Sequence, residues 1–400
     1  MKRVLIVDDD VAVTNYLMVF LMQTEIYESE VVNDSRQVPE LLDREAFDVM
    51  LLDMNMPGLS GPDVLKLLQE RNLQLPVIVL TGFSDVELAV KAMKLGAFDY
   101  LTKPVEDEVL LEVLAKAIDH RALHSSIAQL PSEPKREDLA RRENFEQLPT
   151  VDPAMIRLFA QVEKLAESHF SIFIQAERGS MAALLAEAIH RASPYRDGPF
   201  VHVDLPAYDP ELLPAVFFGR APDWSGTREE QPGLLEKAEH GTLFLYCIED
   251  LPAPMQARLL RVIHAGEYYR ESSSQVRKIQ LRIIASSPVD LSGDEYRDRF
   301  SPELIYHLRV NAIRIPPLRE RPDDIPLLAG GILEQEGRRQ GKPIREISPE
   351  LMALLQGYRF PGNMKELQQI ISSAVAGEET GRLTPEALTR YVYERLRQGG

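Results

Sequence analysis

The chain has 400 residues, 44% of them hydrophobic, and carries a formal net charge of −17 with a pI near 5.0. This length exceeds one ordinary domain, and the apolar share is enough for two or three cores. The acidic balance argues against nonspecific binding to nucleic acid or anionic membranes, because either surface repels a negative chain. One cysteine excludes a disulfide framework, and no apolar run approaches the about 20 residues of a membrane helix. We therefore expect a cytoplasmic protein without a signal peptide.

Short apolar runs alternate with helix-period segments through residue 120. The runs lie at residues 4–7, 49–52, 77–80 and 100–101. Continuous apolar runs of this length favour strands buried on both faces. They predict an α/β fold in which helices cover both sides of a parallel sheet.

Each of these predicted strands ends in a polar residue. Asp8 and Asp9 follow the first run, Asp53 the second, Thr81 the third and Lys103 the fourth. Because the carboxyl ends of parallel strands form the binding crevice of such a sheet, these groups are expected to converge. Clustered carboxylates suit Mg²⁺, and an aspartate beside a lysine suits attack on a phosphoryl donor. The alternative, in which the acids only cap the next helix, requires every strand-end position to coincide by chance.

Residues 52–58, LDMNMPG, and 96–104, GAFDYLTKP, carry a strong resemblance to the receiver domain of response regulators. The resemblance implies a flavodoxin-like, doubly wound domain over residues 1–121 with a five-stranded parallel sheet. It implies that a histidine kinase phosphorylates Asp53, and that the Lys103–Pro104 peptide is cis. The other implied site residues are Asp8, Asp9, Asp53 and the backbone carbonyl of Asn55 for Mg²⁺, Thr81 and Lys103 for the phosphoryl group, and Tyr100 as the aromatic switch.

A second alternating region follows a linker that we predict at residues 122–148 from its serines, prolines and mixed charges. The later strands are expected at residues 171–174, 200–203, 242–245, 281–285 and 312–315. From residue 321 onward the pattern is helical only, which indicates a small all-α subdomain.

This second region resembles the AAA+ domain of NtrC-type activators, which remodel the alternative sigma factor sigma-54. The matching segments are residues 188–193, 241–245, 259–263, 316–326 and 360–363. The resemblance implies an AAA+ α/β subdomain over residues 149–319. A helical lid with a C-terminal helix is implied over residues 320–400.

The positions that should contact ATP have changed. A phosphate-binding loop needs glycines for close backbone approach and a lysine for the β- and γ-phosphates. Here Ala176 and Met181 stand in place of glycines, and Ala182 stands in place of the lysine. Arg178 supplies positive charge, but from a different position of the loop.

The other catalytic positions of the family are altered as well. They are Tyr246 and Cys247 for the metal-binding and water-activating acids, Ser301 and His307 for the two trans-acting arginines, Pro288 for the polar sensor, and Lys365 for a second arginine. Glu249 and Asp250 are interpreted as loop acids rather than substitutes. Each lost group is normally worth several kcal/mol of transition-state stabilisation. We therefore expect a pseudo-ATPase, with ATP an improbable ligand.

These observations predict a two-component response regulator whose output is a protein–protein interaction, with itself, an AAA+ homologue or another target. One alternative is an ATP-dependent sigma-54 activator, and another is a ligand-sensing scaffold that uses the former nucleotide cleft. The sigma-contacting loop of the family corresponds to residues 222–227, where Trp224 is interpreted as partly buried rather than as an exposed contact. The chain stops without room for a helix-turn-helix, so direct DNA binding is not expected.

Overall fold

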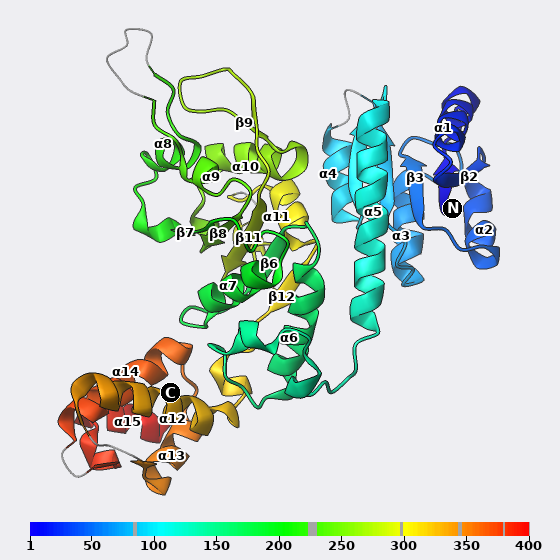
Figure 1. Ribbon diagram of the computed structural model, residues 1–400. Helices are drawn as coiled ribbons and strands as arrows, with labels where there is room; N and C mark the ends of the chain where they lie inside the picture. Colours follow the sequence, from blue (N-terminus) through cyan, green and yellow to red (C-terminus); the bar gives the residue numbers. More distant parts are fainter. Residues whose placement is uncertain (83–85, 223–229, 297–298, 343–345, 379–380, 400) are drawn as a thin grey trace. The chain divides into compact units, whose positions relative to one another are not determined.

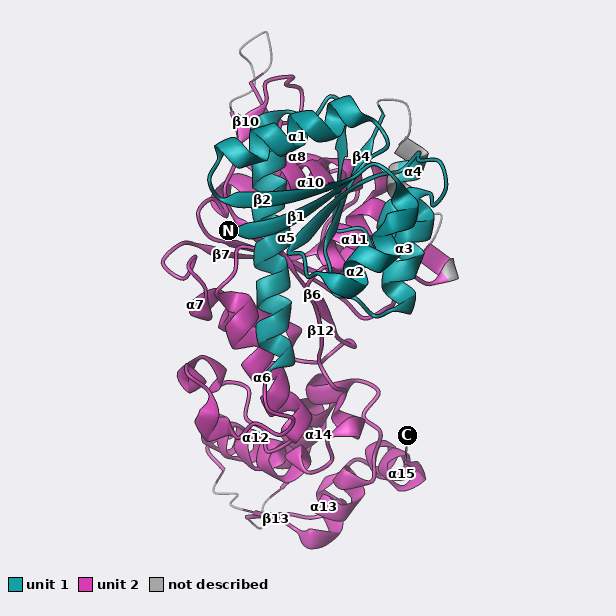
Figure 2. Cartoon of the chain, turned by 90° about the vertical axis from the view of Figure 1, so that its right-hand side faces the viewer, with its two compact units in different colours: residues 1–129 teal, residues 130–400 magenta. Residues whose placement is uncertain are grey.

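The computed structural model describes residues 1–82, 86–222, 230–296, 299–342, 346–378 and 381–399 (Figure 1). The chain divides into two compact units, Met1–Gln129 and Leu130–Gly400 (Figure 2). Among the described residues, no helix is both long and apolar enough to cross a membrane.

The first unit is built around a five-stranded parallel sheet in the order β2-β1-β3-β4-β5. Its strands are β1 Lys2–Val7, β2 Tyr27–Val32, β3 Val49–Asp53, β4 Val77–Thr81 and β5 Asp99–Thr102, and its helices are α1 Val11–Gln23, α2 Val38–Arg44, α3 Gly61–Glu70, α4 Val86–Lys94 and α5 Asp107–Ala128. Every residue of β3 and β4 is buried, as their continuous apolar runs predict. The doubly wound α/β fold is confirmed.

Strand β2 has no counterpart among the predicted apolar runs. It lies at the edge of the sheet, and its middle residues Glu28, Ser29 and Glu30 are only partly buried or exposed. An edge strand tolerates polar side chains because only one long side of it is paired. Periodicity alone therefore did not reveal it.

The region predicted as a linker contains more ordered structure than expected. Helix α5 continues beyond residue 121 to Ala128, and two short 3₁₀ turns follow at Arg136–Asp138 and Arg142–Phe145. Phe145 is fully buried and its ring stacks on Phe159 of α6 with centroids 4.4 Å apart. The end of this segment is thus part of the core of the second unit.

The second unit contains another five-stranded parallel sheet, in the order β12-β6-β11-β8-β7. Its strands are β6 Ile172–Gln175, β7 Phe200–Asp204, β8 Thr242–Tyr246, β11 Arg282–Ser287 and β12 Ala312–Arg314, and the helices of this subdomain are α6 Pro153–Ala166, α7 Ala182–Ala192, α8 Leu213–Phe218, α9 Leu234–Lys237, α10 Ala253–Ala265 and α11 Pro302–Arg309. A two-stranded hairpin pairs β9 Glu267–Tyr268 with β10 Arg277–Lys278.

The lid is mostly helical and has its own core. Its helices are α12 Asp324–Gln340, α13 Pro349–Gln356, α14 Asn363–Gly377 and α15 Arg390–Gln398. A short parallel pair, β13 Glu346–Ile347 with β14 Arg382–Leu383, joins them, so the lid is not purely α. Buried side chains such as Leu328, Leu355 and Ile371 form this core, which is separate from that of the sheet.

Candidate functional site

Three of the predicted strand-end residues meet at the carboxyl edge of the first sheet. The Lys103 Nζ lies 2.6 Å from Asp8 Oδ2 and 2.5 Å from Asp53 Oδ1. The backbone N–H of Asn55 donates to Asp53 Oδ2 at 2.7 Å. Asp8 is 1% exposed and Asp53 is 8% exposed. One lysine thus contacts both carboxylates at this edge.

Burial and charge pairing act in opposite directions on this cluster. Burial raises the pKa of Asp8, while the hydrogen bond from Lys103 opposes that rise. For Lys103, burial alone lowers the pKa, but the bonds to Asp53 and Asp8 outweigh it and the pKa is raised. Lys103 is therefore a cation at neutral pH. A partly buried cation between two carboxylates supplies the positive charge that an incoming phosphoryl group requires.

The other predicted site residues of the receiver do not belong to the cluster of Asp8, Asp53 and Lys103. Thr81 ends β4, is 3% exposed and donates through its Oγ1 to the carbonyl of Gly82 at 3.1 Å. Tyr100 lies on β5 and is partly buried, and the Lys103–Pro104 peptide is cis. Asp9 is exposed, and no group of three or more metal-ligating side chains forms within the described part of the chain.

Mg²⁺ fits the two buried carboxylates better than it fits the full predicted set. Asp8 and Asp53 already share one cationic group, so they are close enough to share a divalent ion with waters and phosphate oxygens as further ligands. Asp9 and the carbonyl of Asn55 remain predicted ligands.

The second crevice lies at the carboxyl edge of the sheet in the other unit. The loop after β6 leads into α7, and Ala182, in the predicted lysine position, is buried in the first turn of that helix. Met181 precedes it as the N-cap residue, and Ala176 is buried where its N–H donates to the carbonyl of Ser287 at 3.0 Å. Arg178 is exposed. It is the only basic residue in the stretch from 176 to 183.

This loop is held against the lid by close backbone packing. Gly179 has a φ of +78°, and a Cβ built on it would lie 2.2 Å from the carbonyl oxygen of Gly362. Only glycine fits both the left-handed backbone and the close approach. The N–H of Lys365 also donates to the carbonyl of Gly179 at 3.3 Å. The phosphate loop is thus in direct backbone contact with the lid.

Three polar side chains, those of Glu177, Arg319 and Asn363, form what we call the loop–lid clasp. Arg319 donates to both carboxylate oxygens of Glu177, at 2.7 and 2.6 Å. Asn363 donates to Glu177 at 3.1 Å and to the carbonyl of Arg178 at 3.2 Å, and it accepts from the N–H of Leu318 at 2.9 Å. Sequence inspection assigned none of these roles. The available signal was a glutamate inside the phosphate loop and an asparagine in the matched segment 360–363.

The altered catalytic positions after β8 are largely buried. Burial raises the pKa of Tyr246, and burial raises the pKa of the Cys247 thiol from its ordinary 9.0 to about 12. Glu249 lies close by, and its side chain is 6% exposed. Burial is also the main cause that raises the pKa of Glu249.

The other predicted positions have structural contacts of their own. Ser301 caps α11 by accepting from the N–H of Leu304, and the ring of His307 packs edge-on against His264 and Tyr306. Pro288 directly follows β11. Residues 223–229 fall outside the described residues, and so does the proposed environment of Trp224.

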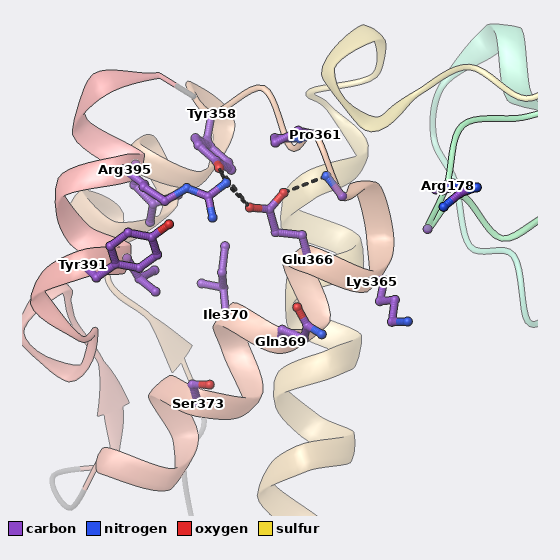
Figure 3. A pocket seen from close by; sticks show the side chains of 14 residues that line it. Arg178, Tyr358, Pro361, Lys365, Glu366, Gln369, Ile370, Ser373, Tyr391 and Arg395 are labelled. Carbon is purple, nitrogen blue, oxygen red and sulfur yellow. Dashed lines mark hydrogen bonds and ion pairs between the residues drawn. The ribbon is translucent and has the colours of Figure 1, made fainter. Parts of the chain in front are cut away.

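A cavity of about 650 Å³ opens between the phosphate loop and the lid. Lys365 on α14 and Arg178 on the phosphate loop are both among its lining residues (Figure 3). Deeper in the lid, the Glu366 carboxylate accepts from the hydroxyl of Tyr358 at 2.9 Å and from Arg395 at 2.8 Å. The volume lies in the range of small-ligand pockets. The exposed cations Arg178 and Lys365 in its lining favour an anionic group there.

Comparison with known proteins identifies the family. Residues 4–115 match the response regulator receiver domain, residues 148–314 the sigma-54 interaction domain, and residues 319–399 the AAA+ ATPase lid domain. The response regulator protein PilR of Pseudomonas aeruginosa is 35% identical over 97% of this chain and 84% of its own length. The chain belongs to the NtrC-type response regulators.

Other members of this family support the same assignment. The transcriptional regulatory protein ZraR of Escherichia coli is 35% identical over 93% of this chain and 82% of its own length. Among solved structures, NtrX from Brucella abortus in complex with ATP has a TM-score of 0.57 and 27% identity, covering 98% of this chain and 84% of that one. The predicted family resemblance of both regions is thus confirmed.

The comparisons contradict the prediction that this NtrC-type chain is a pseudo-ATPase and not an enzyme. The two matches in the second unit are to AAA+ activator modules, and a structural relative was crystallised with ATP. They point to ATPase activity, and the expectation that ATP is an improbable ligand has no support. The prediction was wrong because it equated the combined loss of the family's catalytic side chains with the loss of the site. It gave too little weight to Arg178 of the loop and Lys365 of the lid, which both line the cavity.

Proposed function

We propose that a histidine kinase phosphorylates this response regulator on Asp53 and that the receiver then controls what the sigma-54 interaction domain binds. The observation that carries the proposal is the Asp53 carboxylate, which lies at a sheet edge with Lys103 on one oxygen and the Asn55 N–H on the other. A carboxylate held in this way is oriented for attack without being removed from the crevice surface.

The residues at this edge divide the chemistry among them. A carboxylate oxygen of Asp53 forms the new bond to phosphorus, and the phosphorus–nitrogen bond of the donor phosphohistidine breaks, which leaves the electron pair on the imidazole. Lys103 stabilises the negative charge of the transferred group. Mg²⁺, when held by Asp8 and Asp53 with Asp9 and the Asn55 carbonyl, would neutralise phosphoryl oxygens. Thr81 and Tyr100 would respond to the new charge.

For the second unit we propose nucleotide binding at the crevice after β6 and an interaction with sigma-54 and RNA polymerase. Support comes from the matched sigma-54 interaction domain and from the ATP complex of the relative NtrX. The exposed cations Arg178 and Lys365 replace part of the positive charge that Ala182 does not provide. Contact with a protein partner is the output.

The receiver half is tested with the full chain and a small phosphoryl donor such as acetyl phosphate. The wild type should gain one phosphoryl group in the presence of Mg²⁺, measured by intact mass, and Asp53→Asn should gain none. Asp43→Asn is the matched control, because Asp43 is a surface acid of the same unit that pairs with Arg71. Equal phosphorylation of Asp53→Asn and the wild type would refute the proposal.

The output half is tested by pull-down of purified sigma-54 with phosphorylated and unphosphorylated protein, with ATP turnover followed in parallel. Binding that changes on phosphorylation in the wild type, but not in Asp53→Asn, is the expected result. If phosphorylation leaves sigma-54 binding unchanged in both the wild type and Asp53→Asn, the receiver does not control this binding, and the proposed coupling is contradicted.

A further inference from the structure

The crevice after β6 contains buried polar side chains that the rest of the unit does not satisfy. Among the described residues, the hydroxyls of Ser180 and Ser286 have no hydrogen-bond partner. Both carboxylate oxygens of Glu249 also have no partner in normal hydrogen-bond geometry, although Ser287 and Cys247 lie beside them. Ser180 lies in the phosphate loop, and Ser286 lies on β11 in register with Tyr246 at the end of β8. Leaving a buried polar group unpaired costs about 1–3 kcal/mol, and more when it is charged. Such groups at one sheet edge indicate a site that is completed by a ligand.

Glu249 reaches this edge through an unusual backbone conformation. Cys247, directly after β8, adopts the left-handed region with φ 57° and ψ 58°, and a 3₁₀ turn at Ile248–Asp250 follows. A non-glycine residue in this region costs on the order of 1–3 kcal/mol, and such residues concentrate at functional sites. The turn directs the Glu249 carboxylate toward the phosphate loop, where its Oε1 lies 3.9 Å from Arg178 Nη2. Glu249 thus places an acid in the crevice from two residues after Cys247, which stands where the family carries a catalytic acid.

The two members of this pair differ in their surroundings. The Glu249 side chain is 6% exposed and the Arg178 side chain is 69% exposed. At 3.9 Å the pair is too far apart for a hydrogen bond, so the carboxylate is not neutralised by close contact. A second positive charge is therefore favourable beside Glu249, while Arg178 is accessible to an anion from solvent.

We propose that Glu249 and Arg178 are the ligand-contacting pair of this crevice and together bind a nucleoside diphosphate or triphosphate with its divalent cation. Glu249 contacts the cation, directly or through a coordinated water, and Arg178 contacts the phosphate. Mg²⁺ in nucleotide sites is typically held by one or two carboxylates, waters and phosphate oxygens, which matches one buried acid beside a phosphate loop. This inference rests on the nucleotide binding proposed above and names the residues that carry it.

The alternative is a structural ion pair that only joins the loop to the turn after β8. Such a pair would gain little from a separation of 3.9 Å with one partner mostly in solvent. If the pair were only structural, replacing Glu249 would not change the affinity for nucleotide. The two possibilities therefore differ in how Mg²⁺ affects binding.

The test uses the full-length protein and a fluorescent ADP analogue, with binding followed by anisotropy in Mg²⁺ and in EDTA. Wild-type affinity should be higher in Mg²⁺. Glu249→Gln should weaken binding on the order of tenfold in Mg²⁺ and leave the EDTA value unchanged, as expected for the loss of an acid that serves the metal. Arg178→Gln should weaken binding under both conditions. Asp250→Asn, a neighbouring exposed acid, is the matched control and should behave as wild type.

Several outcomes overturn the inference. Glu249→Gln with wild-type affinity, or with tighter binding in Mg²⁺ and EDTA alike, would mean that the acid does not contact the cation. If the wild type binds no nucleotide in Mg²⁺ or in EDTA, the proposed nucleotide binding is refuted as well. If the wild type binds nucleotide and Glu249→Gln binds it equally well, only the role of Glu249 is refuted. A thermal midpoint equal to that of the wild type establishes that the variant is folded.

Discussion

The two crevices occupy the same topological position, the carboxyl edge of a five-stranded parallel sheet, but they are completed differently. In the receiver, Asp8, Asp53 and Lys103 come from strand ends of one sheet and satisfy one another. In the second unit, Glu249 lies 3.9 Å from Arg178, too far for a hydrogen bond between the two charges. Lys365 is brought to the cavity by a separate subdomain, the lid.

This difference separates a site that is assembled by the sheet from one that depends on subdomain contact. The receiver cluster is complete as soon as its sheet is folded, because the parallel strands place their ends together. The second crevice needs the loop–lid clasp to keep its loop in place, so its properties should change with the lid. The predictions below test this contrast.

The largest expected effect is on the receiver cluster. Lys103→Met leaves the buried Asp8 and Asp53 without their shared cation, and breaking a buried pair by removing one partner typically costs about 3–5 kcal/mol. Hydrogen exchange of β1 and β3 in the full chain should report this loss. Lys116→Met is the control, because Lys116 pairs with Glu112 on the exposed surface of α5, where such pairs contribute below about 1 kcal/mol. Equal effects of the two substitutions would show that the cluster does not depend on Lys103.

The next effect concerns the clasp. Asn363→Gly keeps the left-handed backbone at φ 49° but removes three hydrogen bonds and leaves the buried N–H of Leu318 unpaired. The expected cost is about 1–3 kcal/mol, with faster hydrogen exchange in the phosphate loop and the first turn of α14. Asn72→Gly is the control, since Asn72 is exposed and has a similar φ of 52°. Protection of the loop equal to that of the wild type would mean that the clasp does not hold it.

The same contrast explains how far the sequence could predict these sites. Asp8, Asp53 and Lys103 were predictable because apolar runs mark strand ends and parallel topology places those ends together. Glu249 was interpreted as a loop acid from the family pattern, and the left-handed backbone at Cys247 that turns it toward the phosphate loop leaves no trace in hydrophobic periodicity. The clasp was missed for a related reason, since Glu177 and Asn363 are far apart in the chain and meet only in the folded unit. Local sequence patterns therefore predict a site whose residues lie at the strand ends of one sheet better than a site whose residues come from two subdomains.

A smaller effect is expected for the ion pair of the clasp. Glu177→Gln removes the bond with Arg319, in which both side chains are about one-third exposed, so the cost should be below about 1 kcal/mol. The hydrogen bond from Arg319 lowers the pKa of Glu177 below its ordinary 4.5. Its stabilisation is therefore present above pH 4.5 and is lost as the pH falls through the lowered pKa. Stability curves of the wild type and the variant, measured by urea unfolding, should converge in acid.

The control for this pair is Glu334→Gln, which breaks an exposed pair with Arg338 inside the lid. It should leave hydrogen exchange of the phosphate loop unchanged, whereas Glu177→Gln should increase it. If both substitutions alter the loop equally, the ion pair has no specific part in joining the two subdomains.

The last prediction concerns the thiol of Cys247, whose ionisation does not affect stability at neutral pH. Its rate of chemical labelling reports on the second crevice. Because the thiol is 2% exposed and burial raises its pKa to about 12, it should react with a thiol-specific reagent much more slowly than in the unfolded chain. The unfolded thiol ionises near its ordinary 9.0, so its contribution to stability is complete below pH 9 and declines as the pH rises toward 12. Labelling is site-specific because the chain has one cysteine. Rapid labelling of the native protein at neutral pH would show that the turn after β8 opens readily, and Asn363→Gly should accelerate labelling only if the lid and this turn are coupled.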